Sequence, residues 1–213
     1  MHFFEELGSR AFSRLQGEFA LAIADGERVW LARDRLGIRP LYYGFCQQGF
    51  CFASEAKALV ELVDEVYEFP PGNFLSSERG LYPFQPYFPQ KTAIDGALES
   101  AERLGELVRK AVERAIPPSV DVGVWLSGGV DSSVIAALAR PFVPHLYTFS
   151  VGIAGAEDLK YARQVAEHIG ARHFEQIYKV EEMRQVLEKV IYHLESFDAP
   201  LVNSAVANYL VSK

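Results

Sequence analysis

The sequence predicts two domains of different fold class: an α+β first part with antiparallel strands, then an α/β second part built on a parallel sheet. A hairpin signal, Asp25-Gly26, separates two strand-like runs near the N-terminus. From about residue 98 the apolar spacing becomes helical, and helices alternate with short buried strands. Prolines recur between the two patterns, which places a boundary at 86–95 and the domains at 1–90 and 95–213.

The first part is rich in short apolar segments bounded by turn residues. We expect strands over 19–24, 29–32, 41–43 and 49–52, the last two joined through Gln47 and Gln48. Ser54 is placed to cap a short helix over 55–62. The stretch after it contains Pro70, Pro71, Pro83, Pro86 and Pro89. Such proline spacing is typical of an extended segment that crosses between domains.

The second part alternates helices and strands. Helical spacing of apolar residues predicts helices over 98–112, 130–138, 159–169 and 183–194, with a last helix from about Ser204. Strands are expected over 120–126, 146–151 and 172–178. Pro117, Pro141 and Gly170 stand where the first three helices should end. This order indicates βαβ units and a parallel sheet covered on both faces.

Composition excludes some classes of function. The chain has 213 residues, of which 49% are hydrophobic, so it can bury a core. Its net charge is −7 and it has no basic run, which argues against nucleic-acid binding. No apolar run approaches the ~20 residues of a membrane helix, and the acidic N-terminus does not resemble a signal peptide. We expect a cytoplasmic protein that does not bind membranes.

Cys46 and Cys51 are the two cysteines of the chain, and both lie in or beside apolar strand-like segments. They do not form a CxxC motif. The favoured interpretation is a pair of reduced core residues in a cytosolic protein. A disulfide and a metal site are the alternatives.

One loop carries the strongest functional signal. It lies between the expected strand 120–126 and the helix that follows, and it reads Ser127-Gly128-Gly129-Val130-Asp131-Ser132-Ser133. In a parallel sheet, ligands bind beyond the carboxyl ends of the strands. Two glycines allow a tight turn and close approach of a ligand, while free N–H groups and the helix dipole favour an anion. Serine hydroxyls add donors, so the loop suits phosphate, although serine and glycine are also ordinary turn residues.

Asp131 is the only acid in this loop and would repel phosphate unless a cation intervened. A Mg²⁺ ion between Asp131 and phosphate oxygens resolves the conflict. The loop lacks the spacing and the lysine of a Walker A motif. It resembles the PP-loop of ATP pyrophosphatases, where attack falls on the α-phosphorus and pyrophosphate leaves. A carboxylate that attacks there forms an acyl-adenylate, which a nitrogen nucleophile can open.

Several segments together resemble one family. They are LQGEFALAIAD (15–25), ARDRLGIRPLYY (32–43), FASEAKAL (52–59), FPPG (69–72), VGVWLSGGVDSS (122–133), TFSVG (148–152) and IYHLESFD (191–198). The earlier segments resemble the later half of a glutaminase domain, and the others resemble the start of a synthetase domain. Both belong to the glutamine-hydrolysing asparagine synthetases. The resemblance covers nearly the whole chain, and the co-occurrence of both halves is more specific than either.

The resemblance implies a fold and an activity. The first part would be a remnant of an Ntn-type glutaminase, and the second an ATP pyrophosphatase domain like the adenine nucleotide α-hydrolases. The complete protein would use glutamine or ammonia, aspartate and MgATP, and would form asparagine through a β-aspartyl-adenylate. The residues that would hold the pyrophosphate end of ATP are Ser127, Gly128, Gly129, Asp131 and Ser132. Leu126 and Val151 would contact the nucleoside.

The sequence also departs from the family. Family members carry a nucleophilic cysteine after the initiator methionine, but His2 follows Met1 here, so we expect no glutaminase activity. The later SGEGADE loop and lysine of the family do not occur in the 213 residues, and we assign no catalytic residue. Asn203 stands where we expect an arginine near the aspartate site. The chain reads as an internal fragment with apolar exposed surfaces, which favours a homodimer or a complementing chain.

These departures keep two alternatives open. One is a related amide-forming enzyme that adenylates another carboxylate, like the β-lactam synthetases. The other is an inactive nucleotide-binding remnant or partner subunit. Outside the loop, Arg33, Asp34, Arg35 and Arg39 are interpreted as a structural ion-pair cluster around a tight turn rather than a catalytic group. Glu195 and Asp198 would lie near the substrate pocket if the resemblance holds, and otherwise mark a polar helix end. His168 and His173 are interpreted as surface or capping residues, and Glu157 and Asp158 as acids that favour a helix start.

Overall fold

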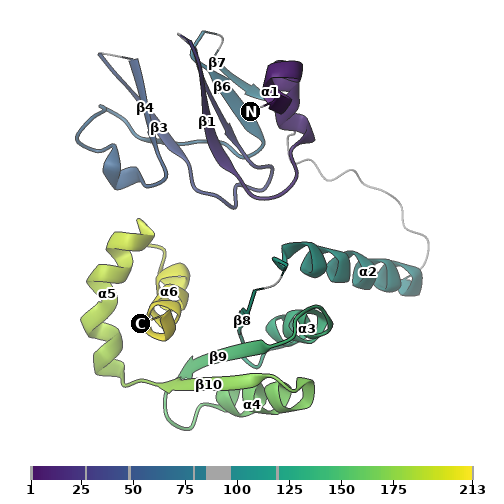
Figure 1. The fold of residues 1–213 in the computed structure, drawn as a ribbon. Helices are drawn as coiled ribbons and strands as arrows, with labels where there is room; N and C mark the ends of the chain where they lie inside the picture. Colours follow the sequence, from purple (N-terminus) through teal and green to yellow (C-terminus); the bar gives the residue numbers. More distant parts are fainter. Residues whose placement is uncertain are drawn as a thin grey trace. The chain divides into compact units, whose positions relative to one another are not determined.

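The computed structural model describes residues 2–212 except 27, 48, 79, 85–96 and 119, and it leaves out the side chains of 97–99. The chain divides into two compact units, Met1–Lys91 and Thr92–Lys213 (Figure 1). The expected boundary at 86–95 lies outside the described residues, as do Gln48, Pro86 and Pro89.

Unit 1 contains a four-stranded antiparallel sheet in the order β1-β2-β6-β7. Its strands are β1 (Ala20–Asp25), β2 (Arg28–Arg33), β6 (Asn73–Ser76) and β7 (Gly80–Pro83). The predicted first hairpin is confirmed: Asp25 pairs with Arg28, and Gly26 takes a φ of 62°, which glycine adopts without strain. Strands β6 and β7 were not expected, because the proline-spaced stretch was predicted to be an extended segment that crosses between domains. Pro83 ends β7 instead of interrupting it, a position where proline removes little pairing.

A second antiparallel sheet has the order β4-β3-β5. Its strands are β3 (Tyr42–Cys46), β4 (Gly49–Ala53) and β5 (Tyr67–Glu68), and the predicted β3–β4 pair is confirmed. The helix expected over 55–62 is wrong, because only the 3₁₀ turn η2 (Ala56–Ala58) forms and Ser54 does not cap it. Hydrogen bonds from Leu59 to Ala56 and from Leu62 to Leu59 close separate three-residue turns. A segment this short cannot offset the cost of starting an α-helix.

The four-stranded sheet lies between two layers. Leu31 and Leu75 pair across β2 and β6 and form a core with Leu41 and Phe69 on the side of the smaller sheet. The opposite face is covered by α1 (His2–Leu7) and the 3₁₀ helix η1 (Gly8–Arg14), neither of which the sequence analysis expected. Phe12 of η1 is 1% exposed, and its ring lies 5.4 Å from that of Phe74. Alternation along the strands therefore gives the sheet two apolar faces and a sandwiched position.

Unit 2 contains a three-stranded parallel sheet in the order β10-β9-β8. The strands are β8 (Val122–Trp125), β9 (Leu146–Gly152) and β10 (Arg172–Ile177). The helices are α2 (Ala97–Ala115), α3 (Val130–Ala139), α4 (Glu157–Ile169), α5 (Val180–Leu194) and α6 (Ala199–Ser212), with a 3₁₀ turn, η3 (Arg140–Phe142), after α3. The predicted alternation of strands and helices is confirmed, and so is the end of α4 at Gly170, whose φ is 66°.

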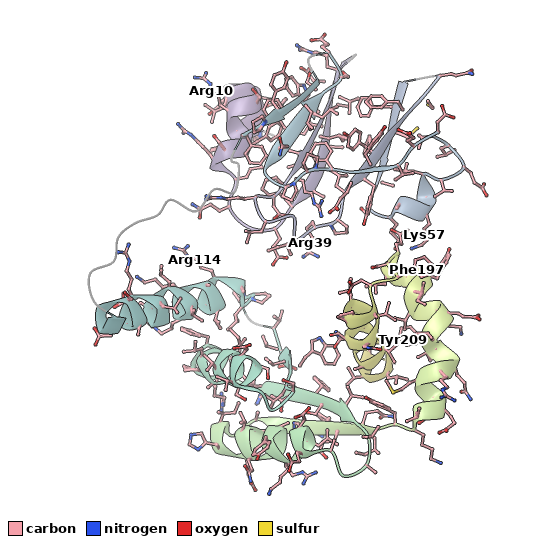
Figure 2. The ribbon with its side chains drawn as sticks, turned by 180° about the vertical axis from the view of Figure 1, so that it is seen from behind. Arg10, Arg39, Lys57, Arg114, Phe197 and Tyr209 are labelled. Atoms are coloured by element: carbon pink, nitrogen blue, oxygen red, sulfur yellow. The ribbon has the colours of Figure 1, made fainter. Side chains whose placement is uncertain are left out.

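The last helix begins five residues earlier than Ser204. The Asp198 carboxylate accepts a hydrogen bond of 3.0 Å from the backbone N–H of Leu201, which is the contact of an N-terminal cap. Pro200 occupies the first turn, where its missing N–H costs nothing. Val202 and Val206 of α6 form a buried cluster with Val186 and Val190 of α5, and Tyr209 packs against it (Figure 2). Asp198 followed by proline is the signal that periodicity alone overlooked.

The parallel sheet has one closed face and one partly open face. Val124, Leu126 and Leu146 pack against α2, α3 and α4 on the closed face. On the other face the Phe149 ring lies 5.9 Å from Trp125 and 5.5 Å from Phe174. Trp125 is 50% exposed and Phe174 is 41% exposed, although α6 lies beside β9. The expectation of a sheet covered on both faces therefore holds for one face only.

In the described part of the chain, none of the helices combines the length and the apolar character needed to cross a membrane.

Candidate functional site

The Ser127–Ser133 loop, residues 127–133, follows β8 and leads into α3, so it lies at the carboxyl edge of the parallel sheet (Figure 1). Leu126 fixes its start. The Leu126 side chain is 1% exposed and packs with Ala136 and Ala162, while its N–H donates to the carbonyl of Phe149 at 2.8 Å. The Ser150 hydroxyl donates to the Leu126 carbonyl. The chain is thus anchored by β9 and by two helices immediately before the loop.

Gly128 has to be glycine. Its φ of 81° lies in the left-handed region, where side chains cause strain. A Cβ atom there would lie 2.5 Å from the carbonyl oxygen of Asp158 and 2.8 Å from the nitrogen of Ala162. The loop therefore packs directly onto the start of α4. Sequence reasoning took Asp158 only as an acid that favours a helix start, and no local pattern showed that its backbone borders the loop.

The serines of the loop hold its shape. The Ser127 and Ser132 hydroxyls are 2.9 Å apart, and Ser132 also accepts from the Ser127 N–H at 3.2 Å. Ser127 in turn accepts from the Gly129 N–H at 3.3 Å. Ser133 donates to the Gly129 carbonyl through both its N–H, at 3.1 Å, and its hydroxyl, at 2.7 Å. These contacts fold the loop into a closed turn without any bound group.

The start of α3 leaves backbone donors open. Its first helical hydrogen bond runs from Ser133 N–H to the Gly129 carbonyl, so the N–H groups of Val130, Asp131 and Ser132 have no acceptor within the helix. Gly129 occupies the cap position, and no side chain caps the helix. Val130 is 79% exposed, which leaves this end of the helix open to solvent. Open N–H groups at the positive end of a helix dipole are suited to bind an anion.

Asp131 is exposed in the first turn of α3, beside those donors. Among the residues that the structure describes, no group of three or more His, Cys, Asp and Glu side chains is placed to hold a metal ion. A single carboxylate nevertheless fits Mg²⁺, which usually takes one or two protein carboxylates and completes its shell with phosphate oxygens and water. The donor set is therefore consistent with a cation that arrives together with a phosphate ligand.

Of the other predicted site residues, Val151 lies at the same edge of the sheet, whereas Glu195, Asp198 and Asn203 follow the far end of α5. Val151 is half-buried near the end of β9 and pairs with Gln176 of β10. Glu195, Asp198 and Asn203 lie around the turn between α5 and α6. Glu195 is the one non-glycine residue with positive φ in the described chain, at 55°, which is an unfavourable backbone for a glutamate. Asp198 caps α6, and Asn203 is exposed on it. Phe197, which directly precedes Asp198, is 87% exposed (Figure 2).

The charged cluster of unit 1 is structural, as the sequence analysis interpreted it. The Arg33 guanidinium is buried and donates to the carbonyls of Arg39, Gly37 and Phe69 at 2.6–2.9 Å, and it pairs with Glu68 at 2.8 Å. Asp34 is 2% exposed, and its carboxylate accepts hydrogen bonds from the backbone N–H groups of Leu36, Ile38 and Arg39. Arg39 is an exposed member and pairs with Glu18 at 3.2 Å.

Backbone hydrogen bonds also set the charge of Asp34. Burial of the carboxyl group acts to raise the pKa of Asp34, but the N–H groups that its oxygens accept outweigh that effect. The pKa of Asp34 therefore lies below its ordinary value. The ionised carboxylate is the form that the turn requires.

His173 belongs to a structural network on the closed face of the sheet. Its Nδ1 lies 2.9 Å from the Thr148 hydroxyl, and its Nε2 lies 3.2 Å from Glu175 without hydrogen-bond geometry. Arg163 of α4 donates two hydrogen bonds to Glu175, at 2.9 and 2.8 Å. These bonds lower the pKa of Glu175 against the opposing effect of its burial. The expectation of a surface or capping role is wrong for His173, because its side chain is only 11% exposed; His168, in the last turn of α4, is exposed.

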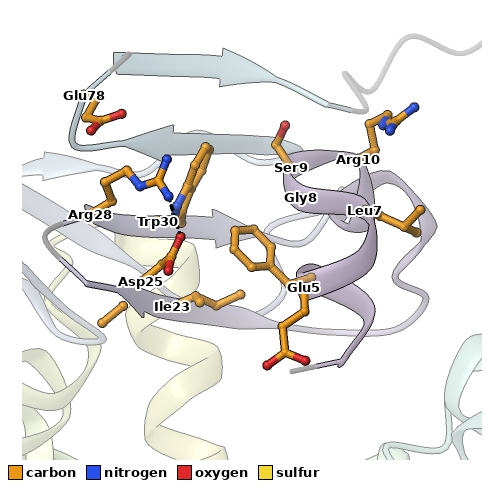
Figure 3. A pocket seen from close by; sticks show the side chains of 12 residues that line it. Glu5, Leu7, Gly8, Ser9, Arg10, Ile23, Asp25, Arg28, Trp30 and Glu78 are labelled. Carbon is orange, nitrogen blue, oxygen red and sulfur yellow. Dashed lines mark hydrogen bonds and ion pairs between the residues drawn. The ribbon is translucent and has the colours of Figure 1, made fainter.

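Unit 1 also contains a cavity of about 580 Å³ between α1, η1 and the first hairpin (Figure 3). Arg28 and Asp25 pair across its wall at 2.7 Å, and Phe4 and Trp30 supply apolar surface. The indole Nε1 of Trp30 is buried without a hydrogen-bond partner in the described residues. Both acids and arginines line this cavity, so its charges favour neither an anionic nor a cationic ligand.

Fold and site together define a class: a two-unit protein whose α/β unit presents an open glycine–serine loop at the carboxyl edge of a parallel sheet. The family model for asparagine synthase matches residues 103–213, just over half of the chain, and the model for a glutamine amidotransferase domain matches residues 1–87. The chain belongs to the asparagine synthase family.

Relatives with curated names agree with this assignment. The chain is similar to asparagine synthetase B [glutamine-hydrolyzing] of Escherichia coli K12, with 34% identity over 99% of this chain and 41% of the relative. It is also similar to asparagine synthetase [glutamine-hydrolyzing] 2 of Arabidopsis thaliana, with 34% identity over 100% of this chain and 39% of the relative. The chain thus spans about two fifths of the length of these relatives.

Among solved structures, the chain is similar to an NH3-dependent NAD synthetase of Campylobacter jejuni. Identity is 20%, the TM-score is 0.35, and the match covers 56% of this chain and 50% of that one.

Proposed function

We propose that the Ser127–Ser133 loop binds the pyrophosphate part of MgATP and that the complete protein uses it to amidate aspartate. The observation that carries the proposal is the open start of α3, where three backbone N–H groups beside Gly129 have no acceptor in the helix. The rigid seat of Gly128 on α4 keeps these donors in place before any ligand arrives. A preformed anion site of this kind suits a leaving pyrophosphate.

The proposed roles follow from position. The N–H groups and the Ser127 and Ser132 hydroxyls hold the β- and γ-phosphates, and Asp131 is the residue that would hold Mg²⁺. When bound, the cation neutralises phosphate charge and so favours departure of pyrophosphate. The backbone around Leu126 and the side chain of Val151 are proposed to border the nucleoside. The Leu126 side chain itself is in the core, so its contribution is through the backbone.

The proposed reaction has two steps. The side-chain carboxylate of aspartate attacks the α-phosphorus of ATP, and pyrophosphate leaves as the β-aspartyl-adenylate forms. Ammonia then attacks the acyl carbon and its nitrogen loses a proton. The bond between the acyl carbon and the phosphate oxygen breaks, and AMP leaves with the electron pair. Family membership and the curated relatives support asparagine biosynthesis over another carboxylate. We also propose that the fold of unit 2 is of the ATP pyrophosphatase type and that unit 1 corresponds to part of an Ntn-type glutaminase.

Two measurements test this proposal. Calorimetric titration of the purified chain with magnesium pyrophosphate should give saturable binding that depends on Mg²⁺. Exchange of labelled pyrophosphate into ATP, measured on the complete protein, should require aspartate. Exchange that requires a different carboxylate would support a relative that acts on that carboxylate. Binding without any exchange would support a nucleotide-binding remnant, and absence of pyrophosphate binding would refute the site itself.

A further inference from the structure

The β3–β4 hairpin of unit 1 has two unlike faces. One face carries aromatic side chains, and Tyr43 and Phe50 of that face pack on the core of the unit. The other face carries small residues apart from Tyr42, which pairs with Ala53 at the start of β3. In register order these are Gly44 opposite Cys51 and Cys46 opposite Gly49. Because residues two apart on a strand share a face, both cysteines lie on the small-residue face.

Each cysteine faces a glycine across the strand pair, and this brings the two sulfur atoms together. Neither glycine has a side chain that could separate the thiols, and the two cysteine side chains meet on the diagonal. Their Sγ atoms are 3.8 Å apart and in hydrogen-bond contact. Gly44 has no room for a side chain, since a Cβ atom would lie 2.5 Å from Val63 and 2.6 Å from the Glu65 carbonyl oxygen.

We propose that Cys46 and Cys51 are a redox-active dithiol that closes to an intramolecular disulfide when it meets a small disulfide oxidant such as oxidised glutathione. A thiolate of the pair attacks one sulfur of the oxidant, and one glutathione leaves as its thiolate. The second cysteine thiolate then attacks the protein sulfur of the mixed disulfide, and the second glutathione leaves. Two protein thiols lose two electrons and two protons, and one oxidised glutathione becomes two reduced molecules.

The short distance between the sulfur atoms favours attack of the second cysteine on the mixed disulfide. A disulfide needs its sulfur atoms about 2.05 Å apart, so closure from 3.8 Å requires side-chain rotation together with some approach of the two strands, because diagonal partners lie farther apart than direct ones. Both cysteines are half-buried, so a small oxidant can reach them. The hydrogen bond with Cys46 raises the pKa of the Cys51 thiol, with desolvation acting in the same direction. Because the thiolate is the nucleophile, closure should be slower near neutral pH than in mildly alkaline solution.

Mass spectrometry can test the proposal on the whole chain. No lysine or arginine separates the two cysteines, so both fall in the tryptic peptide 36–57 (the Arg39–Pro40 bond resists trypsin). The protein is incubated with oxidised glutathione, alkylated without reduction and digested. We expect the wild-type peptide to lose about 2 Da and to resist alkylation until a reductant is added.

Single substitutions separate closure from simple glutathione attachment. In Cys46→Ser or Cys51→Ser the remaining thiol has no partner, so we expect a stable adduct of about 305 Da on that peptide. The wild-type protein should not accumulate this adduct. Three outcomes overturn the proposal: wild-type adducts that persist as in the variants, disulfide-linked dimers on a non-reducing gel, or free thiols in the wild type under conditions that modify the variants.

Discussion

Two loops of this protein contain similar residues and are built in opposite ways. The loop 34–39 of unit 1 and the Ser127–Ser133 loop of unit 2 each follow a strand and contain an aspartate and a glycine in the left-handed region. In loop 34–39 the aspartate turns inward and accepts three backbone N–H groups. In the Ser127–Ser133 loop the aspartate is exposed, and the backbone donors open to solvent.

This difference separates a structural loop from the proposed binding loop. A buried polar group without a partner is costly, so a loop that serves stability satisfies its own donors and acceptors. A loop that binds a ligand leaves backbone N–H donors without a protein acceptor. These donors face solvent and hydrogen-bond to water until the ligand replaces it. The sequence around Arg33 and Asp34 is dense in charged residues, as active sites often are. Only the hydrogen bonds show that these side chains stabilise the fold.

The largest expected effect is on stability at Asp34. Asp34→Ala should lower the unfolding free energy of unit 1 by about 3 kcal/mol, because three backbone N–H groups lose their acceptor in a buried turn. Asp131→Ala should change the stability of unit 2 by less than about 0.5 kcal/mol, as expected of an exposed site. Trp30 and Trp125 are the only tryptophans, one in each unit. Urea unfolding followed by fluorescence in Trp125→Phe or Trp30→Phe backgrounds therefore reports each unit; equal losses at the two aspartates would break the comparison.

The second effect concerns the two glycines of the Ser127–Ser133 loop. Gly128→Ala should cost unit 2 about 2 kcal/mol, since a Cβ atom meets α4 and the backbone is left-handed. Gly129→Ala is the matched control: its φ of −73° suits any residue, and its Cβ would lie 3.4 Å from the Ser127 hydroxyl. Gly129→Ala should therefore keep near wild-type stability in the same urea assay. Equal costs at the two positions would mean that the packing on α4 does not set the loop.

The third effect is a pH dependence of loop 34–39. The folded pKa of Asp34 is below its ordinary value, so its contribution is complete above the pKa of the unfolded chain and is lost as pH falls through the folded pKa. The difference in unfolding free energy between wild type and Asp34→Asn should therefore shrink as pH is lowered from about 5 to about 3. Urea titrations at several pH values in the Trp125→Phe background measure it. A difference that stays constant would show that the charge of Asp34 is not what the turn uses.

The smallest effect is on ligand affinity at Asp131. Asp131→Asn should weaken Mg²⁺-dependent pyrophosphate binding by about tenfold, or about 1.4 kcal/mol, because one negative ligand for the cation is removed. Stability should not change. Calorimetric titration with and without Mg²⁺ is the measurement, and Asp121→Asn, an exposed acid just before β8, is the control. If Asp131→Asn binds as the wild type does, the cation is held without this carboxylate.

Sequence periodicity predicted most elements of unit 2 because each helix buries one stripe and each strand is short and apolar. Asp198 and Pro200 show where it failed: the cap signal was present, but the apolar spacing began later. In unit 1 the failures have another cause. Strand β6 forms by pairing with β2, and β7 forms by pairing with β6. The local sequence of these strands does not indicate which strand each will pair with. The helix expected at 55–62 was too short for its propensity to decide the outcome.

The sequence by itself determined the family, the two fold classes, the Ser127–Ser133 loop and its place between a strand and a helix, because these depend on local composition and spacing. The tertiary structure decided which polar residues were satisfied. It seated Gly128 on α4, turned the Asp34 carboxylate onto its own backbone, and set Cys46 diagonally beside Cys51. The Gly128 contact depends on atoms from a distant part of the chain. The contacts of Asp34 and Cys46 are close in sequence, but they depend on the backbone path of the turn and the hairpin, which residue types alone do not specify.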